Sequence, residues 1–261
     1  HYLNLFITKL IILIFFLHSF NEYDIIVSMK TQCFDLIVIG GGHAGAEAAL
    51  IASRMQINTL LITTLKEAIA RMPCNPSIGG LAKSHLVYEL DALGGKMGRN
   101  ADQTALQAKT LNLSRGPAVW ASRCQCAKRE YTERMQAVIA QQNHLTVLED
   151  AVISLNCTTS PDSAEQIIAG VVTASNGSFS AKSVVVTAGT TLRGRIWIGK
   201  DSVESGGDNR PAVNLLSECL ENLGFDLIRL KTGTPPRLKA SSCDYSRCKR
   251  QDGEIPRPMF H

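Results

Sequence analysis

Residues 34–45 read Phe-Asp-Leu-Ile-Val-Ile-Gly-Gly-Gly-His-Ala-Gly. The apolar, β-branched run 34–39 is typical of a buried parallel strand. Glycines then turn the chain, and the alanine-rich segment 46–55 favours a helix. A second apolar run, 58–63, completes a β-α-β unit of about thirty residues. This order predicts an α/β protein with a Rossmann-like domain.

The glycines of this unit follow the pattern Gly40-x-Gly42-x-x-Gly45, which is informative because a strand precedes it and a helix follows. The first glycine allows a tight turn, the second lets the backbone approach a pyrophosphate, and the third lets helix and strand pack closely. The helix N-terminus then faces the phosphates with free N–H groups. We therefore predict that a dinucleotide contacts Gly40, Gly41, Gly42, His43, Ala44 and Gly45.

Two further features bear on which dinucleotide binds. A ribose-binding acid is expected about twenty residues after the glycines, but the second strand ends in Thr63-Thr64 and Glu67 comes late. Residues 184–189, Val-Val-Val-Thr-Ala-Gly, form a buried strand of the kind that flavoproteins place beside the cofactor, although a plain core strand has the same pattern. Together with the glycine motif, this strand favours FAD over NAD.

The remaining pattern predicts further elements and two modules. Asn176-Gly177 predicts a hairpin turn between strands at 167–174 and 178–181. Two prolines and two glycines in 71–80 exclude regular structure there. We expect helices at 83–93, 122–142 and 211–223, and loops at 112–119 and 200–210. We expect the first part of a glutathione-reductase-like FAD-binding domain at 33–224. Because Pro and Lys/Arg increase after Gly224, we expect the start of an inserted second domain at 225–261.

The composition is that of an ordinary globular protein: 261 residues, 45% hydrophobic, 19% charged, with a net charge of +4. This mild excess permits a polyanionic partner without requiring one. The eight cysteines form no tight framework and no CxxC zinc pattern. We therefore expect mostly free thiols, no metal site and a cytoplasmic location.

The first residues are strongly apolar around 10–17 (Leu-Ile-Ile-Leu-Ile-Phe-Phe-Leu). A signal peptide or membrane anchor is one interpretation, but the run is short and no small-residue cleavage site follows. Upstream sequence translated ahead of Met29 is the other, so we interpret 1–28 as an apolar extension and expect no membrane association. Because 256–261 lacks a terminating element, we expect the chain to be a fragment.

Cys74 is the candidate reactive residue. It lies between Pro73 and Asn75-Pro76, shortly before a helix that contains Lys83 and His85. A loop thiol near a helix N-terminus and cations is a nucleophile when its pKa is lowered, whereas a buried cysteine is structural.

A group of basic residues has two interpretations: it contacts phosphates, or it is a solvated helix face with interleaved acids. These residues are Arg115, Arg123, Lys128, Arg129, Arg134, Lys231 and Arg237.

Taken in order, several stretches resemble the MnmG (GidA) family, the FAD-containing subunit of a tRNA wobble-uridine modification enzyme. PCNPSIGG and LKTGTPPR are specific to that family. The other matching stretches are FDLIVIGGGHAGAEAA, DQTALQAKTLNLSRGPAV, VVVTAGTTL and ESGGD.

The resemblance implies FAD as cofactor, NADH as reductant, a homodimer, and a heterotetramer with the GTPase MnmE. It implies transfer of an aminomethyl or carboxymethylaminomethyl group to C5 of tRNA uridine 34, with methylenetetrahydrofolate as carbon donor and glycine or ammonium as the amine. It also implies FAD contacts at Val152 and Ser205, and identifies Cys74 with one of two functionally important cysteines. Whether the Cys74 thiolate adds to uracil C6 or transfers a proton stays open.

Three alternatives stay open. The first is the related folate- and FAD-dependent tRNA uridine-54 methyltransferase, whose glycine motif is similar. The second is a flavin-dependent disulfide or NADH oxidoreductase, which predicts a CxxC pair that this sequence lacks. The third is a non-catalytic nucleotide- or RNA-binding fragment.

Overall fold

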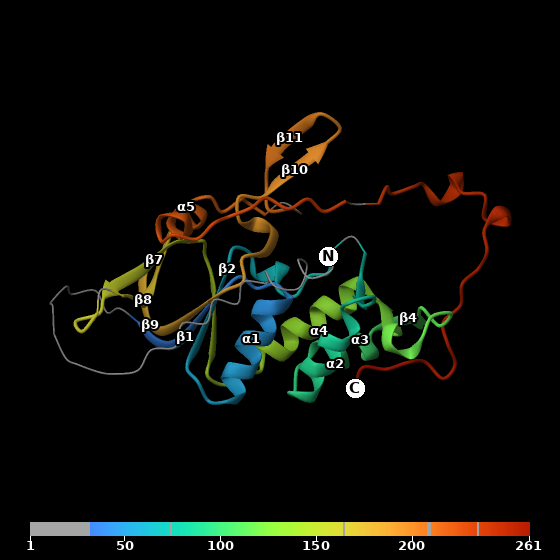
Figure 1. Ribbon diagram of the computed structural model, residues 1–261, viewed down its shortest axis with the longest axis horizontal. Helices are drawn as coiled ribbons and strands as arrows, with labels where there is room; N and C mark the ends of the chain where they lie inside the picture. The colour runs from blue at the N-terminus through green and yellow to red at the C-terminus, as the bar shows by residue number, and fades with distance from the viewer. Residues whose placement is uncertain (1–31, 74, 164, 208–209, 234) are drawn as a thin grey trace. The chain divides into compact units, whose positions relative to one another are not determined.

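The computed structural model describes residues 32–261 except positions 74, 164, 208–209 and 234. It forms two compact units (Figure 1). Unit 1 contains residues 32–71 and Met135–Leu227, and unit 2 contains Met72–Arg134 and Ile228–His261. The apolar extension expected at 1–28 lies outside the described residues, and the domain boundary expected near 225 stays a prediction.

Unit 1 is built on a sheet with the strand order β6-β2-β1-β9-β8-β7. The first four strands in this order are parallel, and β7, β8 and β9 form an antiparallel meander. The strands are β1 (Cys33–Ile39), β2 (Thr59–Thr63), β6 (Leu145–Glu149), β7 (Val152–Thr159), β8 (Gln166–Thr173) and β9 (Gly177–Val186). This arrangement confirms the predicted Rossmann-like α/β fold.

Helices cover the sheet of unit 1. α1 (His43–Arg54) packs on β1, β2, β6 and β9, and α5 (Leu215–Asn222) packs on β7. Side chains alternate between the faces of a strand, and one face of β1 and β2 joins the core cluster that contains Leu216 and Leu220 of α5. Because Ala46 and Ala49 of α1 are small and fully buried, this helix lies close to the sheet.

The turn between β8 and β9 is tied to the end of β6. Asp150 Oδ2 accepts hydrogen bonds from the backbone N–H groups of Ser175 (3.1 Å) and Asn176 (3.0 Å), and from Asn176 Nδ2 (2.7 Å). Asp150 also lies two residues before Val152 of β7, which pairs with Thr173 of β8, so these hydrogen bonds close the end of the meander where the chain enters it from β6.

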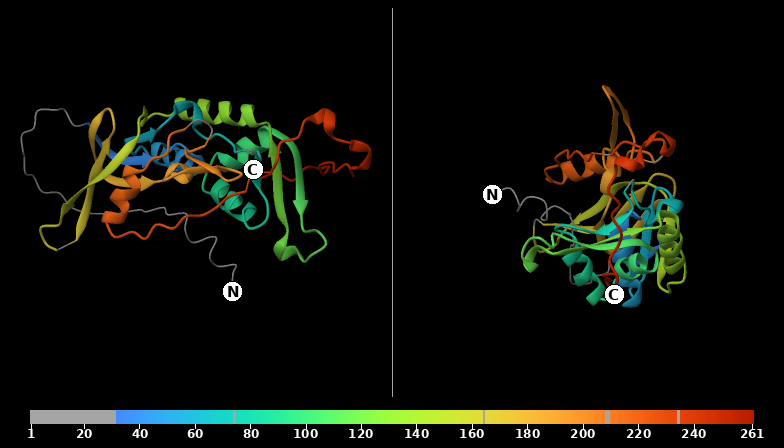
Figure 2. Two further views of the ribbon diagram at one scale, coloured as in Figure 1. Left: turned by 90° about the horizontal axis from the view of Figure 1, so that it is seen from above. Right: turned by 90° about the vertical axis from the view of Figure 1, so that its right-hand side faces the viewer.

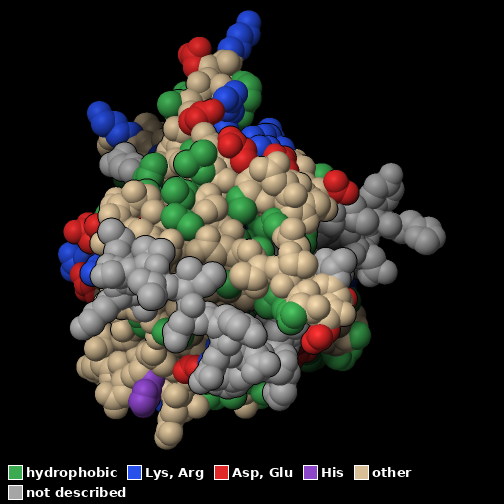
Figure 3. Space-filling model, turned by 90° about the vertical axis from the view of Figure 1, so that its left-hand side faces the viewer, with side chains coloured by type: hydrophobic (Ala, Val, Ile, Leu, Met, Phe, Trp, Pro, Cys, Tyr) green, Lys and Arg blue, Asp and Glu red, His purple; other side chains and the backbone are tan. Residues whose placement is uncertain are grey.

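A small antiparallel hairpin, β10 (Arg195–Ile198) with β11 (Asp201–Glu204), projects from unit 1 (Figures 1 and 2). All eight of its residues are exposed, Trp197 among them. Figure 3 shows basic and acidic side chains together at its tip, where Lys200 and Asp201 lie.

Unit 2 has a three-stranded sheet in the order β3-β5-β4, and two helices. Phe260 of its C-terminal segment is buried against Tyr88, with ring centroids 5.2 Å apart. α4 (Lys128–Ala140) begins in unit 2 and ends in unit 1. The other elements are β3 (Ser77–Gly79), α2 (Ser84–Ala92), α3 (Met97–Gln103), β4 (Ala105–Leu111) and β5 (Ala121–Cys126).

Several sequence predictions of local structure are wrong in part. The helix predicted at 122–142 begins only at Lys128, because the preceding residues pair as β5 with β3 and β4. The loops predicted at 71–80 and 200–210 contain β3 and β11. The strands predicted at 178–181 and 184–189 are one strand, β9, which ends at Val186. In each case strand pairing overrides local propensity.

Within the residues that the structure describes, no helix combines the length and apolar character needed to cross a membrane.

Candidate functional site

The candidate site lies in unit 1, at the carboxyl ends of the parallel strands. β2 lies on one side of β1 and β9 on the other, so the chain connections diverge at β1. In open α/β sheets, ligands bind in the crevice at such a switch point. The Gly40–Gly45 turn, Thr63 and Thr187 all follow or end strands at this edge.

Gly40 and Gly45 are required by packing. Gly40 has a φ of +100°, which disfavours any residue with a side chain, and a Cβ there would overlap the Thr187 carbonyl. A Cβ on Gly45 would overlap the Gly40 carbonyl oxygen and lie 2.6 Å from Thr187 Oγ1. These contacts match the predicted roles of the first and third glycines in turn formation and helix–strand packing.

Gly42 differs from its neighbours because nothing lies within 4 Å of where its Cβ would be. It is exposed and forms the N-cap of α1, with a φ of −65° and no side-chain cap. The first turn of α1 contains no acidic residue. The partial positive charge and the N–H groups at this end of α1 are therefore directed at accessible space, as an anion site requires.

Thr187 holds the glycine turn against β9. Its hydroxyl group lies 2.8 Å from the Ile39 carbonyl oxygen and 2.9 Å from that of Gly40, so its one hydrogen is shared between these two acceptors. The sequence predicted that residues 184–189 lie beside the cofactor, but it did not predict a role for the Thr187 hydroxyl group. A Thr-Ala-Gly triplet directly after a buried strand is the signal that could have identified it.

A second hydrogen bond that supports the glycine turn was not predicted from the sequence. Ala70 donates its N–H to the Gly41 carbonyl oxygen at 2.8 Å. Ala70 has a φ of +51°, and a Cβ on Gly41 would lie 2.8 Å from the Ile69 side chain. The segment 69–70 therefore supports the turn at Gly41, whereas Thr187 supports it at Gly40. No local sequence motif predicts this contact.

The structure supplies no acid in the usual ribose position at the end of β2. The Thr63 hydroxyl is directed to the Leu65 carbonyl oxygen at 3.4 Å, and Glu67 is exposed on the following 3-10 turn. Glu149 at the end of β6 accepts the Lys66 N–H at 2.6 Å, which places one carboxylate near this edge. The acid that the sequence lacks after the second strand is therefore also missing from the end of β2 in the described structure.

His43 and Ala44 begin α1 and are partly buried. Burial lowers the pKa of His43, so the imidazole is neutral at neutral pH. The N-terminus of α1, rather than a histidine cation, provides the positive potential here.

Val152 and Ser205, the other predicted contacts, are positioned differently. Val152 begins β7, and its side chain is in the core, 3% exposed. Only its backbone is therefore suited to contact a ligand. The Ser205 hydroxyl lies 3.2 Å from the Arg210 carbonyl oxygen and accepts the Gly207 N–H at 3.1 Å. Ser205 N–H bonds to Gly194, so this loop lies beside the segment that follows β9.

Residues 35–261 match the family model described as "Glucose inhibited division protein A", GidA. The chain belongs to the GidA family. This confirms the resemblance found from the sequence motifs.

Relatives of this GidA-family chain include the "tRNA uridine 5-carboxymethylaminomethyl modification enzyme MnmG" of Bacillus subtilis. The two are 47% identical over 235 residues, covering 87% of this chain and 36% of the relative. The MnmG of Ligilactobacillus salivarius is 46% identical over 230 residues, 87% of this chain and 34% of the relative. The chain therefore spans about a third of the length of these relatives.

Solved structures agree with this assignment. GidA of Aquifex aeolicus is similar with a TM-score of 0.80 and 41% identity, covering 87% of this chain and 37% of that one. The GidA-related protein of Thermus thermophilus has a TM-score of 0.53 and 17% identity, over 75% of this chain and 70% of that one. The second likeness concerns the fold alone.

Cys74 of this GidA-family chain lies outside the described residues, and its catalytic role stays a prediction. The seven basic residues singled out from the sequence all belong to unit 2. Arg123 is on β5 rather than on a helix, and Arg129 is paired with Glu133 at 3.5 Å. Arg134 donates to Gln103. Some of these basic side chains are exposed, and some are paired with acidic or amide side chains. Both the phosphate-binding and the solvated-face interpretations stay open.

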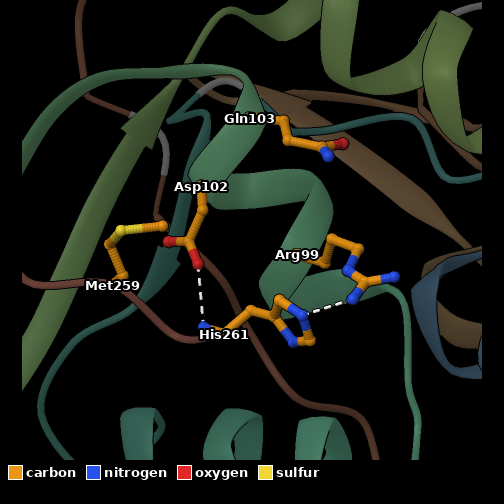
Figure 4. Close-up of a pocket in the computed structure, with 5 residues that line it drawn as sticks. All are labelled: Arg99, Asp102, Gln103, Met259 and His261. Atoms are coloured by element: carbon orange, nitrogen blue, oxygen red, sulfur yellow. Dashed lines mark hydrogen bonds between the residues drawn. The ribbon is translucent and has the colours of Figure 1, made fainter.

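Unit 2 contains a hollow of about 310 Å³ that the sequence did not indicate (Figure 4). Asp102 Oδ2 accepts the N–H groups of Phe260 and His261, both at 2.9 Å. Burial raises the pKa of Asp102. The carboxylate fastens the C-terminal segment to α3, which explains its burial without a ligand. The hollow is lined by Arg99, Asp102, Gln103, Met259 and His261.

Proposed function

We propose that this protein binds FAD through the Gly40–Gly45 turn and serves in tRNA modification. The reaction is transfer of an aminomethyl or carboxymethylaminomethyl group to C5 of the wobble uridine. The observation that carries the proposal is the open N-terminus of α1 at Gly42, within a chain of the GidA family. The MnmG names of the relatives support the choice of reaction.

The residues present fit a dinucleotide. At Gly42 the backbone is exposed, the space for a Cβ is open, and no first-turn acid repels a phosphate. The N–H groups at the start of α1 bind and orient the pyrophosphate, while Thr187 fixes the turn that presents them. Bound FAD supplies hydride and electron transfer, which side chains alone do not provide. Val152 and Ser205 are proposed as further contacts.

Cys74 is the proposed catalytic residue. C5 of uracil is a poor nucleophile until another group adds to C6. A cysteine thiolate is the side chain suited to that addition, and proton transfer is the other role open to it. The family specificity of the PCNPSIGG stretch around Cys74 supports its involvement.

This chain spans about a third of the length of its relatives. We also propose partners and co-substrates for the modification reaction. They are tRNA, NADH as reductant, methylenetetrahydrofolate as carbon donor, a second copy, and an MnmE-type GTPase in a heterotetramer. Residues 33–224 are proposed as the first part of the FAD-binding domain, and 225–261 as the start of an NADH-binding or substrate domain. The proposed location is the cytoplasm.

The test is Cys74→Ser in the full-length protein, with Cys248→Ser, a change at an exposed cysteine of unit 2, as the control. We expect Cys74→Ser to keep the yellow FAD spectrum and to lose wobble-uridine modification, measured by nucleoside mass spectrometry. The control should keep both. Normal wobble modification in Cys74→Ser would contradict the catalytic role. A colourless wild-type protein, or methylation of uridine 54 instead, would contradict the proposed function.

A further inference from the structure

Unit 2 contains a pair of cysteines that the proposed function does not use. Cys124 and Cys126 lie two residues apart on β5, so both side chains point to the same face of the sheet. They are 1% and 0% exposed, and their sulfur atoms are 3.8 Å apart. The Cys124 sulfur also lies 3.4 Å from the Ala101 carbonyl oxygen.

The spacing of the two residues permits a disulfide at the limit of its normal geometry. Two steps along an extended strand separate the Cα atoms by about 6.6–6.8 Å. Disulfides occur with Cα atoms roughly 4.4–6.8 Å apart and need sulfurs about 2.05 Å apart. Closing the gap from 3.8 Å therefore requires side-chain rotation and a local change in β5. Such a bond is strained and readily reduced.

We propose that Cys124 and Cys126 are a modification site that a hydroperoxide oxidises to an intrachain disulfide, distorting β5. The Cys126 thiolate attacks one peroxide oxygen, breaks the O–O bond and becomes a sulfenic acid, releasing hydroxide. The Cys124 sulfur then attacks the sulfenic sulfur, forms the S–S bond and expels the hydroxyl group as water. With hydrogen peroxide, two thiols lose two electrons and two protons, and two water molecules form.

The surroundings of the pair assign these roles. The hydrogen bond with Cys124 holds the pKa of the Cys126 thiol below its usual value, against the opposing effect of burial, and Thr104 adds to the lowering. The same hydrogen bond and burial raise the pKa of Cys124. The thiolate is the reactive form, so Cys126 is the residue that attacks the peroxide. Since both sulfurs are buried, the oxidant must be small and uncharged, as hydrogen peroxide is.

A change in β5 reaches the segment that follows Cys74. β5 is the middle strand of its sheet, and Ile78 of β3 lies opposite Cys124. Cys126 donates its N–H to the Pro76 carbonyl oxygen at 2.8 Å, and Gly80 donates to Ser122 at 2.8 Å. Oxidation of the pair should therefore loosen residues 76–80, next in the chain to the proposed catalytic loop.

The modification is tested by peptide mapping of the folded protein after treatment with hydrogen peroxide. Trypsin cuts after Arg123 and Lys128, and the peptide 124–128 contains both cysteines and no others. We expect this peptide to lose two hydrogens, to resist alkylation, and to regain two alkylatable thiols after treatment with dithiothreitol. In Cys124→Ala, Cys126 should instead stop at the sulfenic acid, which dimedone traps.

Two results would overturn the modification. One is a peptide 124–128 that stays fully alkylatable while exposed Cys33 and Cys248 become oxidised. The other is direct conversion of a single cysteine to sulfinic acid in the wild-type protein.

The link to the Cys74 segment is tested separately by amide hydrogen exchange. We expect residues 76–80 to exchange about tenfold faster in the oxidised protein, the effect of weakening one or two hydrogen bonds. Residues of β1 and β2, in unit 1, serve as the internal reference and should not change. Equal exchange at 76–80 in both states would refute the link.

Discussion

Replacing Gly42 by alanine should separate cofactor binding from folding. The residue has a φ of −65° and a ψ of −176°, which alanine adopts readily, and the new Cβ meets nothing within 4 Å. The remaining cost is that of a poorer N-cap, about 1 kcal/mol or less. The added methyl group, however, occupies the space through which a pyrophosphate must approach the start of α1. Losing one charge-assisted hydrogen bond there costs about 1.5–3 kcal/mol, so FAD should bind roughly 10- to 150-fold more weakly.

The assay is a titration with FAD, followed by flavin fluorescence, together with thermal unfolding without FAD. Gly45→Ala is the contrasting variant, since its Cβ would overlap the Gly40 carbonyl oxygen and lie 2.6 Å from Thr187 Oγ1. We expect Gly45→Ala to lower the melting temperature, because overpacking of this kind costs about 1–3 kcal/mol. If Gly42→Ala binds FAD as tightly as the parent protein, or unfolds as easily as Gly45→Ala, the assignment of the site is wrong.

Two further predictions concern groups around the sheet. Thr187→Val should destabilise unit 1 by about 1–3 kcal/mol, because the hydroxyl group that bridges the Ile39 and Gly40 carbonyl oxygens is lost and only the backbone N–H of residue 187 still reaches Ile39, whereas Thr187→Ser should restore most of the loss; equal urea midpoints for all three proteins would contradict this. Burial raises the pKa of Asp150, but hydrogen bonds, led by that from Asn176, lower it more, so the folded-state pKa is below the usual 3.8. Asp150 therefore stabilises the protein above that pH, and this contribution is lost as the pH falls through the folded-state pKa. Melting curves of Asp150→Asn should differ from wild type at pH 7 and converge as the pH falls below 3.8, and a constant difference across this range would count against the assignment.

The glycine turn could be predicted because all of its parts are close in sequence. A strand, three glycines, a helix and a second strand follow one another within about thirty residues, and Gly40 and Gly45 have the turn and packing roles expected of them. The support from Ala70 and the Thr187 hydroxyl could not be predicted in the same way. Both depend on chain segments that meet the turn only after the sheet has formed.

The segment 122–126 was predicted wrongly for the same reason, because its structure depends on distant segments. Arg123 and Gln125 favour a helix by their intrinsic propensity, and the sequence alone predicted one. In the structure this segment pairs with Ser77–Gly79 on one side and Ala105–Leu111 on the other. The free energy of strand pairing depends on neighbours that lie far away in sequence, so a local pattern does not report it.

The sequence by itself determined the family, the βαβ unit and the glycine fingerprint, because short-range spacing and specific motifs encode them. Only the tertiary structure decided that Gly42 faces open space, while a Cβ on Gly45 would overlap the backbone of the same turn. It also decided that Cys124 and Cys126 form a buried pair on a central strand instead of lying on a helix. Exposure and pairing arise from contacts between distant segments, and these exist only once the chain is folded.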